Sequence, residues 1–440
     1  MEKQERMELT RWAVKQALDA GAGQAAAKTA SVRSIDVEFR DGKLEKLQEA
    51  TQSGLTLAVY LDQRFSAHST SNLDRKFLAG FIKEAVAMTR YLGQDPFRTL
   101  PDPSLYAGRE SLDLELVDPA GSQITMDQRL ALAREIEAAA RTADPRVISA
   151  TAGVGDAAGA SARVTSNGFE GETESTLFYA GAEVTVGDGA GGRPEDWDYA
   201  TVRFRSQLPA GAGLGANAAR MALAKIGQAK VESGLYDMVV DNRVGERLVS
   251  LLLGPMQARA LQQKSSYLDG MIGKSIGSTL LTLTDDPFIP RGLASRLFDD
   301  EGISARPRVL VDQGVLREYF VDDYYGRKLG MAATTGSPSN LILAAGRQTG
   351  PALLAGVNRG IYVTSFLGGN SNPTTGDFSL GVSGMLIESG KLTRPVNEMN
   401  LSGNLREFWN RLSAVGNDPY LYSAWKIPTL LFTQADFSGA

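Results

Sequence analysis

Three short clusters of carboxylates are the residues of this 440-residue chain whose types come closest to catalytic chemistry. They are Asp285-Asp286, Asp299-Asp300-Glu301 and Asp322-Asp323. Two carboxylates that a fold brings together can act as acid and base when their environments separate their pKa values. Adjacent carboxylates more often serve as turn residues and helix caps, and we favour that interpretation. An oxygen-only magnesium or calcium site stays open, although the spacing is not that of an EF-hand.

Two hydroxyl-rich loops, 334–340 and 374–376, form a second group of candidate side chains. A serine or threonine nucleophile needs a neighbouring base. The second half of the chain contains no histidine, so the base would be a carboxylate or a lysine such as Lys274 or Lys328. The spacing puts no such base beside either loop, which argues against nucleophilic catalysis.

Cysteine is absent, and histidine occurs once, as His68. The missing thiols exclude disulfides, cysteine nucleophiles and thiolate metal sites. A zinc hydrolase typically needs two or three imidazoles, which this chain cannot supply. We expect His68 to be a half-exposed residue at the end of a short strand, and we predict no catalytic residue and no metal ligand in this chain.

Two stretches combine acids, glycines and apolar residues in a way that favours a groove. Residues 291–302 (RGLASRLFDDEG) place an apolar pair before three carboxylates. Residues 374–390 (TTGDFSLGVSGMLIESG) have the pattern of a glycine-rich turn followed by a strand. Glycines at such positions let a backbone turn sharply or approach a neighbour closely.

The composition is that of an ordinary globular protein long enough for two domains, with a net charge of −5. The mild negative charge and the lack of a polybasic segment argue against nucleic acid as a partner. The N-terminal residues are too highly charged for a signal peptide, and no apolar stretch has the length of a membrane span. We therefore expect a soluble, cytoplasmic protein.

The first half of the sequence has the pattern of amphipathic helices mixed with antiparallel strands. Asp41-Gly42 predicts a hairpin turn, and residues 147–204 predict an antiparallel meander with one wet face. The second predicted helix has Phe77, Phe81, Ala85 and Met88 on one side. The predicted helices span 5–20, 77–92 and 128–143, and the predicted strands span 32–39, 44–47, 54–61 and 64–69.

Residues 211–215 (GAGLG) superficially suggest a phosphate-binding loop, but Pro209 precedes them and the spacing is not GxGxxG. We interpret them as a linker or the entry to a helix over 218–231. The domain boundary is expected here, which gives an α+β protein of two domains, 1–230 and 231–440, each a mostly antiparallel sheet with packed helices. In the second domain we predict helices over 245–253 and 403–412 and strands over 235–240, 279–284, 308–310, 341–345, 360–366, 384–388, 391–395 and 429–433.

Six segments that agree in order and approximate spacing give the chain a resemblance to the TldD/PmbA family, and most of all to its TldE (PmbA) branch. The resemblance covers nearly the whole chain. The segments are 54–71 (GLTLAVYLDQRFSAHSTS), 264–276 (KSSYLDGMIGKSI), 291–302 (RGLASRLFDDEG), 324–329 (YYGRKL), 374–391 (TTGDFSLGVSGMLIESGK) and 401–418 (LSGNLREFWNRLSAVGND).

The resemblance implies a two-domain α+β protein that forms dimers around a central cavity. In this family TldD carries zinc on an HExxxH helix and a later cysteine. TldE lacks that site and serves as its partner in a metallopeptidase that degrades unfolded peptides and trims precursor peptides. The branch was also named for modulating DNA gyrase.

This chain departs from the zinc-binding pattern at both places where ligands would stand. The segment that would hold HExxxH falls near 250–255 (SLLLGP), and the segment that would supply cysteine has Tyr422-Ser423-Ala424-Trp425. The resemblance therefore implies that this subunit is not itself a zinc peptidase, and that zinc is expected only in a TldD-like partner.

An exposed strand edge can capture extended peptide through its main chain with little regard for sequence. The glycine-bearing strand from Gly376 to Glu388 is the candidate edge. Its alternative is a core strand whose glycines allow tight packing. The predicted peptide-binding residues are Gly376, Asp377, Phe378, Gly381 and Gly384.

Three functional hypotheses follow. The first is a TldE-like subunit, metal-free, in a cytoplasmic peptidase, with a TldD-like chain or itself as partner in a dimer. The second is a peptide-binding or scaffold protein that forms a homodimer without cutting, or a protein that modulates gyrase. The third is an independent hydrolase that uses the acidic clusters or the hydroxyl-rich loops.

Overall fold

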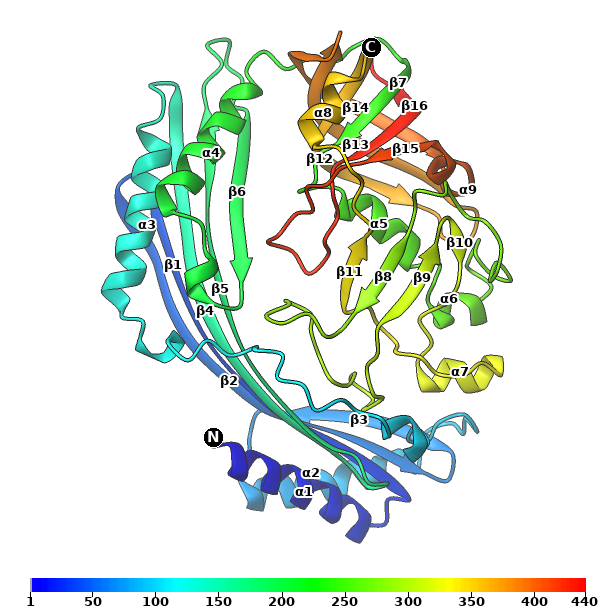
Figure 1. Ribbon diagram of the computed structural model, residues 1–440. Helices are drawn as coiled ribbons and strands as arrows, with labels where there is room; N and C mark the ends of the chain where they lie inside the picture. The colour runs from blue at the N-terminus through cyan, green and yellow to red at the C-terminus, as the bar shows by residue number, and fades with distance from the viewer. Residues whose placement is uncertain (1) are drawn as a thin grey trace.

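A long, curved antiparallel sheet forms most of the N-terminal half of the protein (residues 2–230), as the computed structural model of residues 2–440 describes it (Figure 1). Its six strands lie in the order β3-β2-β1-β4-β5-β6. The strands are β1 (Gln24–Arg40), β2 (Lys43–Leu61), β3 (Arg64–Thr70), β4 (Val147–Thr165), β5 (Glu170–Val186) and β6 (Glu195–Val202). The helices of this half are α1 (Lys3–Asp19), α2 (Arg75–Thr89), α3 (Met126–Arg141) and α4 (Gly211–Ala224).

The hairpin predicted at Asp41-Gly42 joins β1 and β2. Both residues have positive φ angles, 48° and 80°, which is the turn geometry that matches the twist of paired strands. The strands predicted over 32–39, 44–47 and 54–61 are parts of these two long strands. The link between 47 and 54 was missed because the first part of β2 is solvent-exposed and carries no alternating apolar pattern.

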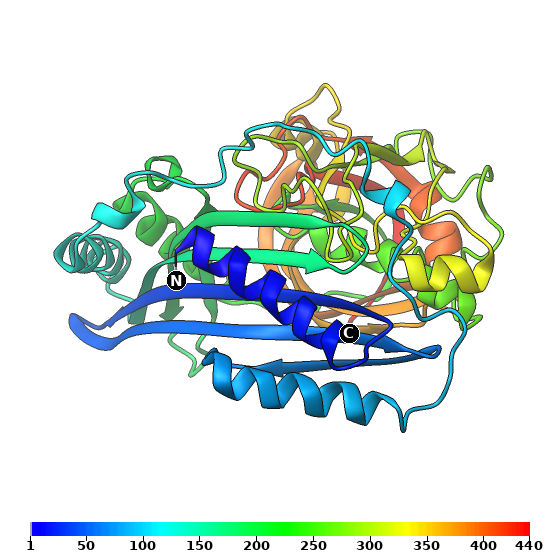
Figure 2. The same cartoon turned by 90° about the horizontal axis from the view of Figure 1, so that it is seen from below.

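All four helices cover one face of the sheet. Apolar side chains of β1 and β2 pack under α1 and α2 at one end, and those of β4 and β5 pack under α3 and α4 at the other. Figure 2 shows α1 and α2 beside each other on this face. The opposite, concave face of the sheet is left to face the C-terminal half (Figure 1).

The side of α2 that packs on the sheet is not the side that the sequence predicted. The helix buries Leu78, Ile82 and Val86, whereas Phe77 and Met88 are 46% and 60% exposed. Both stripes of this helix are apolar, so periodicity alone cannot tell which one faces the core.

The helix α4 begins at Gly211, so the GAGLG segment lies within its first turns rather than before a helix that starts at 218. A Cβ atom on Gly215 would come within 2.1 Å of the carbonyl oxygen of Ile136 in α3. The glycine therefore permits close contact between two helices and has no phosphate-binding role in this arrangement.

The C-terminal half (residues 231–440) contains two sheets, in the orders β14-β13-β12-β7-β16-β15 and β10-β9-β8-β11. An additional pairing of β14 with β16 closes the larger sheet on itself. The strands are β7 (Gly234–Val240), β8 (Leu283–Asp286), β9 (Arg308–Asp312), β10 (Val315–Leu316), β11 (Asn340–Leu343), β12 (Arg359–Ser371), β13 (Asp377–Glu388), β14 (Lys391–Asn404), β15 (Leu412–Val415) and β16 (Leu430–Ser438). The helices are α5 (Glu246–Leu253), α6 (Ala258–Gln262), α7 (Asp323–Leu329), α8 (Gly350–Ala355) and α9 (Leu405–Phe408).

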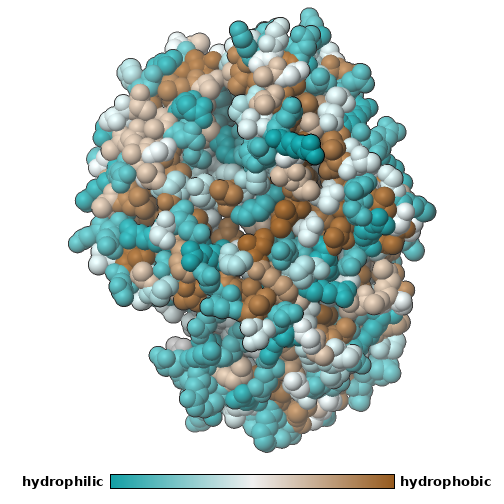
Figure 3. Space-filling model, viewed as in Figure 1, coloured by the Kyte–Doolittle hydropathy of each residue, from teal (hydrophilic) through white to brown (hydrophobic). Residues whose placement is uncertain are grey.

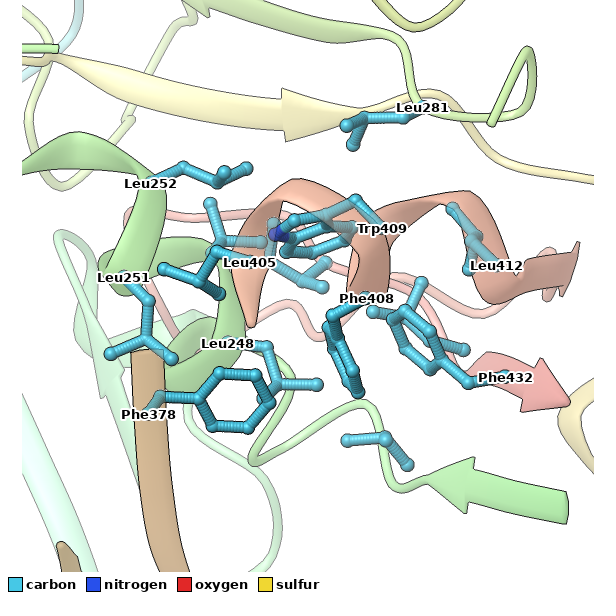
Figure 4. Packing of buried hydrophobic residues seen from close by; sticks show 14 of the residues in the cluster. Leu248, Leu251, Leu252, Leu281, Phe378, Leu405, Phe408, Trp409, Leu412 and Phe432 are labelled. Atoms are coloured by element: carbon cyan, nitrogen blue, oxygen red, sulfur yellow. The ribbon is translucent and has the colours of Figure 1, made fainter. Parts of the chain in front are cut away.

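The core of this half is built around stacked aromatic rings (Figure 4). Phe408 stacks on Phe432 with ring centroids 4.6 Å apart, and Trp409 packs edge-on against Phe432 at 5.5 Å. The helix predicted over 403–412 is therefore much shorter. β14 continues to Asn404, and the four residues of α9 and a following 3-10 turn carry the aromatic rings inward.

Residues 291–305 dock the C-terminal half onto the long sheet. Lys28 of β1 forms an ion pair with Asp300 at 3.0 Å. Phe298 packs edge-on against Phe169, which lies between β4 and β5, with ring centroids 5.0 Å apart. The segment that the sequence singled out thus serves as the contact between the two halves.

The predicted α+β class with mostly antiparallel sheets is confirmed, with β7 and β12 paired in parallel. Within residues 2–440, no helix has the length and apolarity needed to cross a membrane.

Candidate functional site

The helix that contains residues 250–253 and the loop that contains residues 422–425 come together in the structure. The helix α5 follows β7 after a short turn and packs Leu248, Val249 and Leu252 into the core. Its first residue, Glu246, remains free to meet the loop over 416–427. The Oε2 atom of Glu246 accepts a hydrogen bond from Ser423 Oγ at 2.6 Å.

The residues at this meeting point do not fit a zinc ion. They provide one carboxylate and one hydroxyl, whereas structural and catalytic zinc sites use cysteine, histidine and carboxylate ligands in sets of three or four. Lys426 lies in the same loop, and its Nζ donates to the carbonyl oxygens of Leu421 and Ser423 at 2.6 and 2.7 Å. Burial lowers the pKa of Lys426. An ammonium group here would also repel a cation.

Elsewhere among residues 2–440, no group of three or more histidine, cysteine, aspartate or glutamate side chains is arranged to hold a metal ion.

A buried polar network anchors the turn that leads into α5. The carboxylate of Asp241 accepts from Arg243 Nε at 3.0 Å and from the Tyr362 hydroxyl at 2.5 Å. Burial and the neighbouring Asp241 charge raise the pKa of Tyr362 well above its usual range. The tyrosine is therefore held as a protonated donor, and it positions Asp241 rather than acting as a base.

The loop over 416–427 reaches across to the long sheet. The hydroxyl of Tyr420 donates to the main-chain oxygen of Tyr199 in β6 at 2.9 Å. Tyr199 lies 4.8 Å from Trp197 between ring centroids, and these two side chains are 41% and 42% exposed. Tyr422 lies 5.7 Å from Tyr420, so four aromatic rings border the space between the two halves.

The concave face of the sheet beside these rings holds a shallow cavity of about 310 Å³. Within it the hydroxyl of Tyr179 donates to Asp36 Oδ1 at 2.6 Å. The Tyr179 ring lies over Gly155, where a Cβ atom would come within 2.4 Å of the ring. On the face viewed in Figure 3, hydrophilic and hydrophobic side chains alternate around a recess between the halves.

This surface combines exposed aromatic rings with carboxylates. Such rings provide apolar contact area together with polar edges, and they attract cationic side chains over their faces. The arrangement is suited to holding a flexible chain of mixed composition. Sequence reasoning missed Tyr179, Trp197 and Tyr199, although Trp197 and Tyr199 alternate along a strand (EDWDYATV) and so had to share a face.

The strand predicted to be an exposed edge is not one. β13 pairs with β12 on one side and with β14 on the other. Phe378 is buried against Phe408, and a Cβ atom on Gly384 would meet the oxygen of Tyr362 at 1.9 Å. The glycines allow close strand packing, as in the alternative interpretation. A peptide contact at Gly376, Asp377, Phe378, Gly381 and Gly384 stays a prediction, without the edge that motivated it.

The acidic clusters act mainly as turn and cap residues, as favoured. Asp299 accepts from the backbone N–H groups of Glu301 and Ile303, and Asp322 caps α7. Asp286 accepts from the N–H of Phe288. Asp285 instead joins a buried network, in which its carboxylate accepts from Arg308 at 2.8 Å.

The hydroxyl-rich loop over 334–340 belongs to that same buried network. The Thr335 hydroxyl accepts from Arg308 at 2.8 Å, and the Ser339 hydroxyl donates to Asp285 at 2.5 Å. The Ser339 hydroxyl therefore meets a carboxylate, but Asp285 is also paired with Arg308, and all three side chains are buried, so we interpret the contact as structural. His68 lies on β3 as predicted, half-buried, with Nε2 at 2.9 Å from Ser66 Oγ.

Two family models match the chain. One describes the central domain of PmbA/TldA metallopeptidases and matches residues 119–226, and the other describes their C-terminal domain and matches residues 233–439.

Curated relatives match over much of the same length. The chain is 28% identical to metalloprotease PmbA of Escherichia coli O157:H7, covering 95% of this chain and 92% of that protein. It is 30% identical to a metalloprotease TldD homologue of Haemophilus influenzae, covering 52% of this chain and 50% of that protein.

Solved structures share the fold. A Bacteroides thetaiotaomicron protein, described as a candidate modulator of DNA gyrase, superposes with a TM-score of 0.97 at 41% identity over the full length of both chains. TldE from Thermococcus kodakarensis superposes with a TM-score of 0.84 at 18% identity, covering 98% of this chain and 99% of that one. With family models matching most of its length and a full-length relative at 41% identity, this chain belongs to the TldD/PmbA family.

Proposed function

We propose that this protein is a TldE/PmbA-like subunit of a TldD/PmbA-type metallopeptidase, which holds unfolded or precursor peptides while a TldD-like partner supplies the zinc and cuts them. One observation carries the proposal. The helix α5 holds residues 250–253 of the segment where the resemblance puts HExxxH, and it contains no histidine. Its first residue, Glu246, is bonded to Ser423 in the segment where the resemblance puts cysteine, with Lys426 in the same loop.

The pattern of relatives supports this assignment. Matches to proteins named PmbA extend over 84% to 100% of the chain, whereas matches to TldD homologues extend over 46% to 52%. The chain is therefore more similar, along its length, to the PmbA side of the family.

The surface between the two halves supports a role in holding peptide. Exposed aromatic rings and carboxylates line the same cavity there, and aromatic rings offer apolar contact area to a flexible chain without demanding one sequence. As part of the same proposal, the protein acts in the cytoplasm, forms a dimer and contacts peptide at the residues predicted on and beside β13.

The main alternative is a homodimer that binds peptide or serves as a scaffold without any role in cleavage. A second alternative is an effect on gyrase, since a relative of similar length is described as a candidate modulator of that enzyme.

The test compares the purified chain alone with the chain mixed with an HExxxH-bearing relative. We expect the chain alone to carry no stoichiometric zinc by elemental analysis and to leave β-casein uncut. The mixture should co-elute on gel filtration and cut casein faster than the relative alone.

The matched control replaces the glutamate of the partner's HExxxH motif with glutamine, which should abolish cleavage while leaving co-elution intact. If the chain eluted as a homodimer and did not co-elute with the relative, the scaffold alternative would be favoured. Stoichiometric zinc bound by this chain, with cleavage in the absence of any partner, would refute the proposal.

A further inference from the structure

The first part of β5 has an open edge. On one side β5 pairs with β4 along almost its whole length, from Glu170 to Val186. On the other side it pairs with β6 only from Phe178 onward. No strand covers residues 170–177 on that side in the part of the chain that the structure describes.

The direction of the main-chain groups on this edge follows from one hydrogen bond. The N–H of Thr176 points away from β4 and donates to the oxygen of Leu116 at 2.9 Å. In an antiparallel ladder such groups alternate from residue to residue, so the N–H and C=O groups of Glu174 and Glu172 point the same way. Among residues 2–440, these groups have no hydrogen-bond partner on that side.

The segment over 109–117 spans this edge but is attached only near its two ends. Arg109 Nη1 donates to the oxygen of Glu170 at 2.8 Å, and Leu116 accepts from Thr176. Between these points the segment stands away from β5, held outward by the N–H of Arg291, which donates to Leu114 at 2.8 Å. In Figure 1 it is part of the cyan connection that crosses between the sheet and the loops of the C-terminal half.

A cavity of about 660 Å³ fills the gap between the segment and the edge. It lies within the range of about 300–1,000 Å³ that ligand pockets in proteins occupy. Leu112 and Val117 form one wall and are 47% and 43% exposed, and Leu297 and Phe298 form another. A second cavity of about 700 Å³ continues it toward Arg109 and shares Leu112, Leu297 and Phe298.

The three glutamates at the start of β5 are paired with α1, while Asp113, Arg203 and Arg296 also line the cavity. Glu170, Glu172 and Glu174 form ion pairs with Arg11, Lys3 and Arg6 of α1 at 2.6, 3.4 and 2.8 Å. The groove thus has apolar walls and, at every second residue of β5, main-chain groups without a hydrogen-bond partner. These two features indicate which kind of ligand fits it. The groove suits an extended peptide with apolar side chains at alternate positions.

We propose that this groove binds an extended peptide as an added strand of the long sheet, paired with the main chain of Glu172 and Glu174. The inference takes the class of ligand from the proposed function, but the groove lies apart from Glu246 and Ser423 and needs neither zinc nor a partner. A binding experiment on the purified chain therefore tests it separately.

The probe is a fluorescein-labelled heptapeptide in which valine alternates with serine and threonine, and binding is measured by fluorescence anisotropy. Glu172→Pro removes an N–H that points into the groove and is not used in the ladder with β4, so it should leave the sheet intact. We expect this variant to bind the peptide about tenfold more weakly or worse, the loss expected for one main-chain hydrogen bond and a steric clash.

Glu172→Ala is the matched control, because it removes the same side chain and keeps the N–H. It should lose much less affinity for the peptide than Glu172→Pro does. The same heptapeptide with alternate backbone nitrogens methylated should also lose affinity for the unchanged protein, and this arm stays informative if the proline variant does not fold.

Crosslinking locates the peptide. The chain has no cysteine, so Leu112→Cys creates a single attachment point for a photoreactive label, with Met88→Cys on α2 as the control. We expect crosslinking from position 112 and none from position 88. Equal affinity of the methylated and unmethylated peptides, equal crosslinking at the two positions, or no binding of the heptapeptide would each overturn the proposal.

Discussion

Glu301 is a carboxylate whose surroundings change its acidity strongly. It belongs to the turn that docks the C-terminal half, and its Oε2 accepts from the N–H of Asp323 at 2.9 Å. Burial, with the charges of Asp299, Asp322 and Asp323 adding to it, raises the pKa of Glu301 from 4.5 to about 7. The folded protein therefore holds a proton here that the unfolded chain releases between those two pH values.

This shift predicts that stability falls as pH rises. A carboxyl group with a raised pKa in the folded state contributes stability fully below pH 4.5 and loses it as pH rises through 7. The loss is at most about 3 kcal/mol. Urea unfolding between pH 5 and 8 should show this decline in the unchanged protein and a flatter profile in Glu301→Gln. Parallel profiles for the two proteins would contradict the assignment.

Arg308 and Asp285 form a buried ion pair, with side chains 1% and 3% exposed. Replacing one partner of such a pair leaves the other charge buried and unpaired, so Arg308→Met should destabilise the protein by about 3–5 kcal/mol. The control is Arg317→Met, which removes an ion pair with Asp312 whose side chains are 48% and 44% exposed. That change should cost less than about 1 kcal/mol in the same denaturation experiment. Similar losses of unfolding free energy in the two variants would show that the buried ion pair contributes no more to stability than the exposed one.

At the scale of elements, the contact between α3 and α4 depends on one glycine. A Cβ atom at position 215 would lie 2.1 Å from a carbonyl oxygen of α3, which no rearrangement of a flexible side chain can relieve. We expect Gly215→Ala to lower the melting temperature, with a loss of about 1–3 kcal/mol from overpacking. At Gly213, nothing among residues 2–440 lies within 4 Å of the added atom, so Gly213→Ala should leave stability equal or slightly higher.

The elements also show what the sequence could and could not predict. The Asp41-Gly42 hairpin was predictable because the turn depends on two adjacent residues. The packed side of α2 was not, because it depends on which of two apolar stripes meets a sheet made of distant strands. β13 was taken for an edge because its glycines suit both an edge and a tightly packed central strand, and strand order is a property of the whole sheet.

Some features of the candidate site could likewise be predicted from the sequence, and others could not. The segments 250–255 and 422–425 could be located from family resemblance. In the structure, the helix that contains residues 250–253 meets the second segment through Glu246, four residues before the first. The acidity of Glu301 and the open edge of β5 could not be found, because burial and the residue at which strand pairing begins are properties of the folded chain.

At the scale of the whole molecule, we propose that the halves 1–230 and 231–440 are separate domains joined through the turn over 291–305. The turn contributes two exposed ion pairs, Lys28–Asp300 and Arg291–Glu115, the Phe169–Phe298 contact and several hydrogen bonds to the interface. The aromatic contact should matter more, since exposed ion pairs add little.

Phe298→Ala should therefore loosen the interface, with faster cleavage by a protease within residues 286–305 and intact β-sheet circular dichroism. Leu280→Ala, at an apolar residue that is 42% exposed, is the control and should be cut at the original rate. Equal cleavage rates in the two variants would argue against a docking role for Phe298.

The position of β16 between β7 and β15 has a consequence for how the protein is made. Val240 of β7 pairs with Leu430 of β16. β7 therefore leaves the ribosome long before the strand that it pairs with has been synthesised. Until residues 430–438 emerge, β7 presents an uncovered edge, and the rings of Phe432 and Phe437 are missing from the core. The nascent chain should thus depend on chaperones that shield β-strand edges during translation, and ribosomes stalled before residue 430 should accumulate chains that aggregate.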